Sequence, residues 1–271
     1  MTDTSTSTQS SSSRPSVELD QQEIKLPSAK GNPDSKRPRL RKVMLFVGVP
    51  LAILIAVSAL LMPVRHHDHS SHTYSVPSGR LVVSDDQGSV TFVPSSGRQV
   101  RVTRNFSWGL GGRHVSERVV NGELRINARL TNQWGVSLSG PAHLDYQIAV
   151  PATFAVTVHT RTGAINLSGL QGRLTLSSDT GRIRATVATD YLHAHTATGS
   201  ISLTFTRSPH IVNATSDIGA ITVQVPEDAV SYRVRASSHT ATSVKVRTDP
   251  NGSDSITAHS SIGHVTIKAL P

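Results

Sequence analysis

The hydrophobic pattern changes twice along the chain. Residues 1–42 carry scattered apolar side chains among Ser, Thr, Pro and charged residues, and residues 43–62 form an apolar run without a charge. After residue 73, apolar and polar positions alternate in short stretches. A segment poor in apolar residues cannot offset its ordering entropy, so residues 1–42 are predicted to be disordered. About 20 apolar residues cross a bilayer core as a helix, and alternation is typical of half-buried strands. The pattern therefore predicts a disordered tail, a transmembrane helix and a strand-rich domain.

Basic residues set the expected direction of the membrane helix. Arg65 is the only Lys or Arg close to its C-terminal side. The N-terminal flank carries Lys36, Arg37, Arg39, Arg41 and Lys42. Since positive flanks stay inside, we expect a single-pass protein of the cell membrane with a cytoplasmic N-terminus and an extracytoplasmic C-terminal domain. A cleaved signal peptide is the alternative, but the run ends in Leu-Leu-Met-Pro, which is a poor cleavage site.

A short phrase recurs in the C-terminal part of the chain. Each copy has polar residues, a glycine, one variable residue and a β-branched residue that opens an alternating stretch, as in TATGSISL (196–203). The glycines of these copies are Gly88, Gly163, Gly181, Gly199, Gly219 and Gly263. Glycine tolerates the positive φ of a tight turn, so each copy predicts a turn followed by a strand. A degenerate copy, TATSVKV (240–246), has Ser243 in the glycine place.

A second apolar stretch precedes the turns, for example Leu174 and Leu176 before Gly181. Each repeat is therefore predicted to hold two short strands, and stacked repeats bury what one repeat cannot. The predicted fold is an all-β, repetitive β-solenoid or rolled β-stack over residues 76–271. A β-sandwich is the alternative, because it also has short, regularly spaced strands.

Residues 63–150 are less regular. Residues 63–75 are interpreted as a His-rich linker. Residues 116–129 predict a β-hairpin, with Asn121 and Gly122 as its type I′ turn. The part from residue 73 to residue 150 is interpreted as the N-terminal cap of the stack, which protects its first edge.

The repeat resembles that of a known family. The T-G-x-I phrase occurs together with LDYQIAVP (144–151), which contains Tyr146, Ile148, Val150 and Pro151. In both features the chain resembles the putative adhesin family, a family of bacterial domains of unknown function. Its members have a β-solenoid fold and are often anchored in the membrane by a single helix. The resemblance covers residues 76–268 and implies a place at the cell envelope. It supplies no catalytic residue.

Composition narrows the possible partners. The chain has no cysteine, which excludes disulfides, Cys-bound metal centres and thiol catalysis. Its formal net charge is +9, but the basic residues are spread along the domain and aromatics make up only 4% of the chain. We therefore expect no nucleic-acid partner, and the positive charge favours an anionic envelope surface.

Histidines supply the candidate metal ligands. The tract HHDHSSH contains His66, His67, Asp68, His69 and His72. Imidazole and carboxylate groups suit zinc, copper or nickel, while a polar linker is the alternative interpretation. No other cofactor is expected. His193 and His195 share one strand face, where His159 or His210 of a neighbouring repeat would complete a second candidate set.

Three functions agree with these features. The first is a non-enzymatic bacterial envelope protein whose extracytoplasmic domain mediates adhesion or binds a cell-wall polymer or an envelope protein. The second is an envelope-stress sensor or regulatory subunit that signals through its cytoplasmic tail. The third is a polysaccharide-active β-helix enzyme, with Asp179 and Asp217 as its best acidic candidates. The sequence shows neither a tight acidic cluster nor a G-x-S-x-G elbow, so we expect no enzyme.

Overall fold

The computed structural model describes residues 66–108, 112–131, 143–227 and 230–270. They lie in the second of two compact units, which runs from Leu61 to Pro271. These residues form strands and turns, so the all-β prediction is confirmed. Within these described ranges, no helix has the length and apolar character that crossing a membrane requires. The predicted tail (1–42) and membrane helix (43–62) lie outside them.

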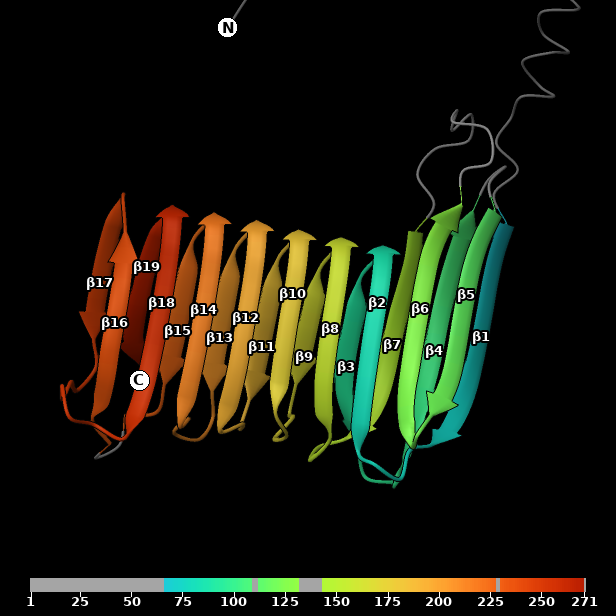
Figure 1. Ribbon diagram of the computed structural model, residues 1–271, viewed down its shortest axis with the longest axis horizontal. Coiled ribbons are helices and arrows are strands. Elements are labelled where there is room, and N and C mark those ends of the chain that lie inside the picture. Colours follow the sequence, from blue (N-terminus) through green and yellow to red (C-terminus); the bar gives the residue numbers. More distant parts are fainter. Residues whose placement is uncertain (1–65, 109–111, 132–142, 228–229, 271) are drawn as a thin grey trace, which may run out of the picture. The chain divides into compact units, whose positions relative to one another are not determined.

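The strands build two large sheets, which Figure 1 shows one in front of the other. In spatial order, the ten-stranded sheet contains β1 (His66–Ser75), β4 (Gln99–Trp108), β7 (His143–Pro151), β3 (Val90–Ser95), β9 (Ile165–Ser168), β11 (Ile183–Val187), β13 (Ile201–Phe205), β15 (Ile221–Val225), β19 (His264–Ala269) and β17 (Ala241–Lys245). The nine-stranded sheet contains β16 (Tyr232–Ser238), β18 (Asp254–Ile262), β14 (Ile211–Ile218), β12 (Tyr191–Thr198), β10 (Leu174–Thr180), β8 (Ala155–Thr162), β2 (Arg80–Gln87), β6 (Glu123–Thr131) and β5 (Gly112–Val120).

From β7 onward the chain alternates between the two sheets. A strand of the nine-stranded sheet is followed by a turn and a strand of the ten-stranded sheet, as in β10–β11 and β12–β13, and we call each such pair a coil. Neighbouring coils pair in parallel in both sheets: Leu174 lies beside Leu192, and Ile183 lies beside Ile201. In Figure 1 the coils stand side by side along the stack.

The core lies between the sheets, because alternate residues of each strand point inward. Equivalent positions on five neighbouring strands hold Ile165, Ile183, Ile201, Ile221 and Val265, and none of these side chains is more than 1% exposed. Full burial of one such side chain contributes about 1.5–3 kcal/mol. β-Branched side chains also fit the pleated surface of a sheet. The same residues therefore favour strand formation and fill the core between the sheets.

One coil lies out of sequence order. The pair β18–β19 sits between β14–β15 and β16–β17, although β16–β17 comes first along the chain. Gly219 and Gly263 are therefore direct neighbours, and the long interval between them in the sequence spans a coil that lies further along the stack.

The prediction that Ser243 takes the glycine place is wrong. Ser243 lies within β17 and pairs with Thr266, while the turn before β17 is at residues 239–240. The register follows the alternation of the strand instead of the repeated phrase: Val244 aligns with the buried Ile267 of β19. The sequence pattern is misleading here because Ser243, a small polar residue within a strand, resembles a residue of a turn.

The predicted hairpin is confirmed. Strands β5 and β6 pair in antiparallel fashion from Gly112 and Thr131 to Val120 and Glu123. Asn121 and Gly122 connect them with φ values of 53° and 77°. Positive φ at both central residues is what a type I′ turn requires.

The expected linker is wrong from residue 66 onward. His66–Ser75 form β1, which pairs with β4 from the pair His66–Trp108 to the pair Ser75–Gln99. This segment lacks apolar alternation, so its sequence does not mark it as a strand. Its pairing rests on backbone hydrogen bonds to the open edge of β4, which any residue except proline can donate.

A buried hydroxyl ladder runs along the glycine turns. In four repeats, the residue three positions before the glycine is a Ser or Thr whose side chain points inward and bonds to the neighbouring coil. Thr160, at the same place before Gly163, is buried without a hydrogen-bond partner among the described residues. The hydroxyl donors and their acceptors are Ser178 and the Gly163 carbonyl (3.2 Å), Thr196 and Gly181 (3.2 Å), Ser216 and Gly199 (3.1 Å), and Ser260 and Gly219 (2.7 Å). Each of these bonds pairs a buried hydroxyl with a backbone carbonyl of the adjacent turn. The spacing Ser/Thr-x-x-Gly is visible in the sequence and would have revealed the ladder.

The glycines themselves are needed because neighbouring turns approach closely. Gly199 has a φ of 152°, and a Cβ atom there would lie 1.8 Å from the carbonyl oxygen of Gly181. The same contact would be 1.8 Å for Gly219 and 2.1 Å for Gly263. No side chain fits at these distances, so glycine sets the spacing between coils.

We expect Gly199→Ala to lower the free energy of unfolding by about 3 kcal/mol, because the Cβ forces the backbones of two coils apart. Urea unfolding of the full-length chain in detergent, followed by circular dichroism, measures the change. The matched control is Gly97→Ala, whose Cβ would meet only Ser95 Oγ at 3.7 Å and Gln99 N at 3.9 Å. The control should change stability by less than about 1 kcal/mol. Equal effects of the two substitutions would contradict the close-contact explanation.

Candidate functional site

Strand β1 divides the candidate metal ligands between two faces. Since side chains alternate, His69 and His72 belong to opposite faces of this strand. The side chains of residues 66–68 lie outside the described ones. Where side chains are described, no three His, Asp or Glu residues are grouped to hold a metal ion. Metal binding by this tract stays a prediction.

The second histidine set is spread along the outer face of the nine-stranded sheet. His193 lies between Thr175 and Asn213, and His195 lies between Ser177 and Thr215. His159 and His259 occupy the same row as His195, each two strands away. Strands two apart are separated by about 9–10 Å, and the described side chains of this face include no group of three His, Asp or Glu residues that could hold a metal ion. His210 instead pairs with Asp254, with Nδ1 and Oδ1 2.5 Å apart.

The other candidates are placed as follows. The six turn glycines lie between a strand of the nine-stranded sheet and the next strand of the ten-stranded sheet. Asp179 and Asp217 are exposed on β10 and β14, with β12 between these strands, so the structure does not bring them together as a catalytic pair. The basic residues at 36–42 lie outside the described ranges.

A polar cluster fills the end of the stack formed by β1, β4 and β5. The Tyr74 hydroxyl donates to Glu117 Oε2 at 2.6 Å, and Arg104 Nη1 lies 3.4 Å from Glu117 Oε1. The Glu117 side chain is only 5% exposed, and His72, one of the predicted metal ligands, is a third partner with its Nδ1 3.7 Å from Glu117 Oε2. Burial raises the pKa of Tyr74 well above its usual range, and the hydrogen bond to Glu117 raises it further. Arg104 opposes both effects. We interpret the cluster as a structural closure of this end.

The raised pKa of Tyr74 makes stability sensitive to alkali. The unfolded chain loses the Tyr74 proton at lower pH than the folded chain does, so the contribution is fully present below the unfolded pKa, about 10, and is lost as pH rises beyond it. We expect Tyr74→Phe to remove one late-titrating phenol and to flatten the loss of stability at alkaline pH. Tyrosinate absorbance and urea unfolding as functions of pH measure these effects. The control is Tyr191→Phe, because the ring contacts of Tyr191 with Arg173 and His210 do not use its hydroxyl. An unchanged titration in Tyr74→Phe would contradict the assignment.

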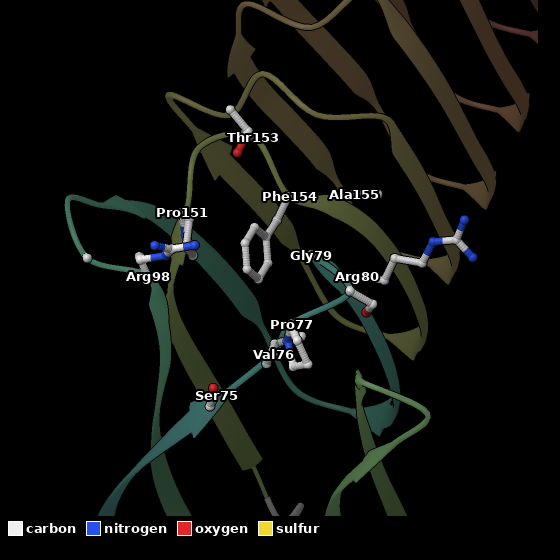
Figure 2. A pocket seen from close by; sticks show the side chains of 12 residues that line it. Ser75, Val76, Pro77, Gly79, Arg80, Arg98, Pro151, Thr153, Phe154 and Ala155 are labelled. Carbon is white, nitrogen blue, oxygen red and sulfur yellow. The ribbon is translucent and has the colours of Figure 1, made fainter.

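A groove of about 650 Å³ lies where three connections meet. They are the connection from β1 to β2, the turn from β3 to β4 and the turn from β7 to β8. The lining residues, shown in Figure 2, are Ser75, Val76, Pro77, Ser78, Gly79, Arg80, Gly97, Arg98, Pro151, Thr153, Phe154 and Ala155. Sequence analysis did not find this groove, because its three segments are far apart along the chain.

Backbone hydrogen bonds fix Phe154 in this groove. Its N–H donates to the Pro151 carbonyl at 3.1 Å, which closes the turn, and the Ala155 N–H donates to the Gly79 carbonyl at 2.9 Å. Gly79 has a φ of 63°, and a Cβ atom there would lie 3.7 Å from the ring of Phe154. Because Gly79 has no side chain, the Phe154 ring lies beside its backbone and remains half-buried.

The groove combines an aromatic ring with positive charge. In Figure 2 the Phe154 ring stands between Arg98 and Gly79, while Arg80 extends away on the far side. Both arginines are exposed, and no carboxylate is among the lining residues. A guanidinium binds carboxylate or phosphate groups through paired hydrogen bonds, and an aromatic face packs against apolar atoms of a ligand. These lining residues include no nucleophile with an adjacent general base, so their chemistry fits binding.

Among known proteins, the chain is similar to solved structures. No family model and no curated protein matches the chain. A putative cell adhesion protein from Clostridium sporogenes is 12% identical, with a TM-score of 0.48 over 75% of this chain and 100% of the other. A putative adhesin from Bacteroides fragilis is 16% identical, with a TM-score of 0.42 over 75% of this chain and 97% of the other. A putative adhesin from Parabacteroides distasonis is 11% identical, with a TM-score of 0.31 over the same shares. Their names agree with the family that the sequence resembles, but at such scores the likeness carries no argument about function.

Proposed function

We propose that the chain is a non-enzymatic, single-pass bacterial envelope protein whose extracytoplasmic domain is a β-solenoid that binds an anionic polymer of the cell wall. The groove around Phe154 carries this proposal, because it offers an aromatic ring and exposed arginines without a competing carboxylate. The apolar run at 43–62 and its basic flank support the membrane anchor. The parallel pairing of neighbouring coils supports the solenoid assignment, because in a solenoid each repeat contacts only the repeats next to it.

The charge of the domain supports an anionic ligand. Some arginines are neutralised locally, as in the pairs of Arg161 with Asp86 and Arg207 with Asp190. Arg80 and Arg98 make no ion pair with any carboxylate in the described ranges. Attraction between such exposed cations and a polyanion weakens with salt, because the Debye length falls from about 10 Å at 0.1 M to about 3 Å at 1 M.

We expect the full-length chain in detergent to co-sediment with cell-wall fragments that retain their anionic polymer, and to do so less at high salt. Arg98→Glu should lower the affinity about tenfold, because it places an anion in the groove. Arg184→Glu is the matched control, since Arg184 is exposed on β11, away from the groove lining. Phe154→Ala tests the ring separately, with circular dichroism to verify folding. Equal binding by Arg98→Glu and Arg184→Glu, or no binding by the parent chain, would overturn the proposal.

The sensor hypothesis differs from our proposal because it requires residues 1–35 for signalling. Under our proposal, deletion of these residues leaves wall binding and any adhesion phenotype unchanged, because the domain after residue 62 is sufficient. Under the alternative, the deletion abolishes the envelope-stress response while wall binding persists. A transcriptional reporter of envelope stress, measured beside the co-sedimentation assay in the same strain, separates the two functions.

A further inference from the structure

The end of the stack away from β1 and β5 has two open strand edges. Strand β16 is the last strand of the nine-stranded sheet, and β17 is the last strand of the ten-stranded sheet (Figure 1). The edge of β16 is used only at its beginning, where Tyr232 N–H donates to the Arg247 carbonyl and Asp249 N–H donates to the Tyr232 carbonyl, both at 3.0 Å. Beyond Tyr232, no described strand pairs with the outer edge of β16, so its backbone groups are accessible to a further strand.

The core is uncovered at this end. Val244 is 40% exposed, whereas Ile267, its partner on β19, is fully buried. Val234 and Ala236 are half-buried on β16, whereas their partners on β18 are fully buried. These three residues line a groove together with Tyr232 and Val246. The inner face of the last coil therefore offers apolar contacts beside an open strand edge.

The opposite end differs in this respect. There the inner space contains the hydrogen bond from Tyr74 to Glu117 and the ion pair of Glu117 with Arg104. Burying that charged group under a further apolar strand would carry a desolvation cost. Strand β5 at that end also has an open edge and exposes Val119 and Val120, but the buried carboxylate of Glu117 lies on the same strand, whereas no buried charge lies among the described residues lining the end formed by β16 and β17.

The charged residues around this apolar surface are mainly basic, and Asp249 is the one carboxylate in the groove lining. Arg233 and Arg235 are exposed on β16 and alternate with the inward residues, and Lys245 is exposed on β17. None of the three makes an ion pair with a carboxylate of the described residues. An added strand would run past Arg233 and Arg235 at the outer face of the sheet, where opposite charges on neighbouring strands stabilise pairing and like charges oppose it.

We propose that this end binds an extended segment of another protein, which adds to β16 as a strand and alternates apolar with acidic residues. Its apolar side chains cover Val234, Ala236 and Val244, and its carboxylates lie beside Arg233 and Arg235. The charge decides against a second copy of this chain: two-fold pairing of β16 with itself would set these arginines against their own equivalents. Strand addition supplies affinity through the main chain, and the alternating pattern supplies selectivity.

The test uses the full-length chain in detergent and a fluorescent peptide of alternating valine and glutamate, seven residues long to match β16. We expect saturable binding by fluorescence anisotropy, and binding at least about tenfold weaker for a peptide of alternating valine and lysine. Arg235→Glu should weaken binding of the acidic peptide to a similar degree and improve binding of the basic one. Arg184→Glu, on an internal strand, should change neither affinity.

Several outcomes would overturn the proposal. One is the absence of saturable binding, and another is an equal effect of Arg235→Glu and Arg184→Glu. A third is a dimer in the absence of peptide, seen by sedimentation velocity, that Val244→Asp converts to a monomer, because a second copy would then occupy this end. Arg233→Glu repeats the charge test if Arg235→Glu fails to fold. Arg98→Glu should leave peptide binding unchanged, so failure here is distinguishable from failure of the wall-binding proposal.

Discussion

Close contact between the turns of neighbouring coils is the constraint on which the stack depends. At four turns, those of Gly181, Gly199, Gly219 and Gly263, the glycine lies against the carbonyl of the glycine in the neighbouring coil, and a buried Ser or Thr hydroxyl donates to that same carbonyl. A larger residue would separate the coils, and an apolar residue in place of the hydroxyl would leave a buried acceptor without a direct donor. The apolar rows can meet in register only because this edge holds the coils at one spacing.

The sequence predicts what is local and periodic. The strand alternation, the glycine interval and the Asn121–Gly122 turn each follow from a few neighbouring residues, and the structure has an all-β fold with this hairpin. Strand β1 escapes prediction because its pairing with β4 relies on backbone groups, which leave no mark on side-chain pattern. The groove around Phe154 escapes it because residues 75–80, 97–98 and 151–155 meet only after folding. Phe154, three residues after Pro151, was a visible hint in the sequence.

The two candidate binding surfaces, the groove around Phe154 and the edge of β16, suit ligands of different shape. The groove around Phe154 pairs an aromatic ring with Arg98 at a set of turns, which suits a ligand that presents one charged group at a time. The β16 edge offers repeated backbone groups beside a row of arginines, which suits an extended chain. The lining of the groove around Phe154 contains no carboxylate, and at the β16 edge Arg233 and Arg235 outnumber the one lining carboxylate, Asp249, so both surfaces favour negatively charged ligands.

The out-of-order coil changes how the stack responds to shortening. In a simple repeat array, removing residues from the C-terminus removes the outermost repeat and leaves the others intact. Here the last strands along the chain, β18 and β19, are internal neighbours of β14 and β15. Their loss would open a gap inside both sheets and separate β16–β17 from everything it pairs with. The outermost coil is therefore held in place by residues that are synthesised after it, and the end of the stack is complete only when the whole chain is.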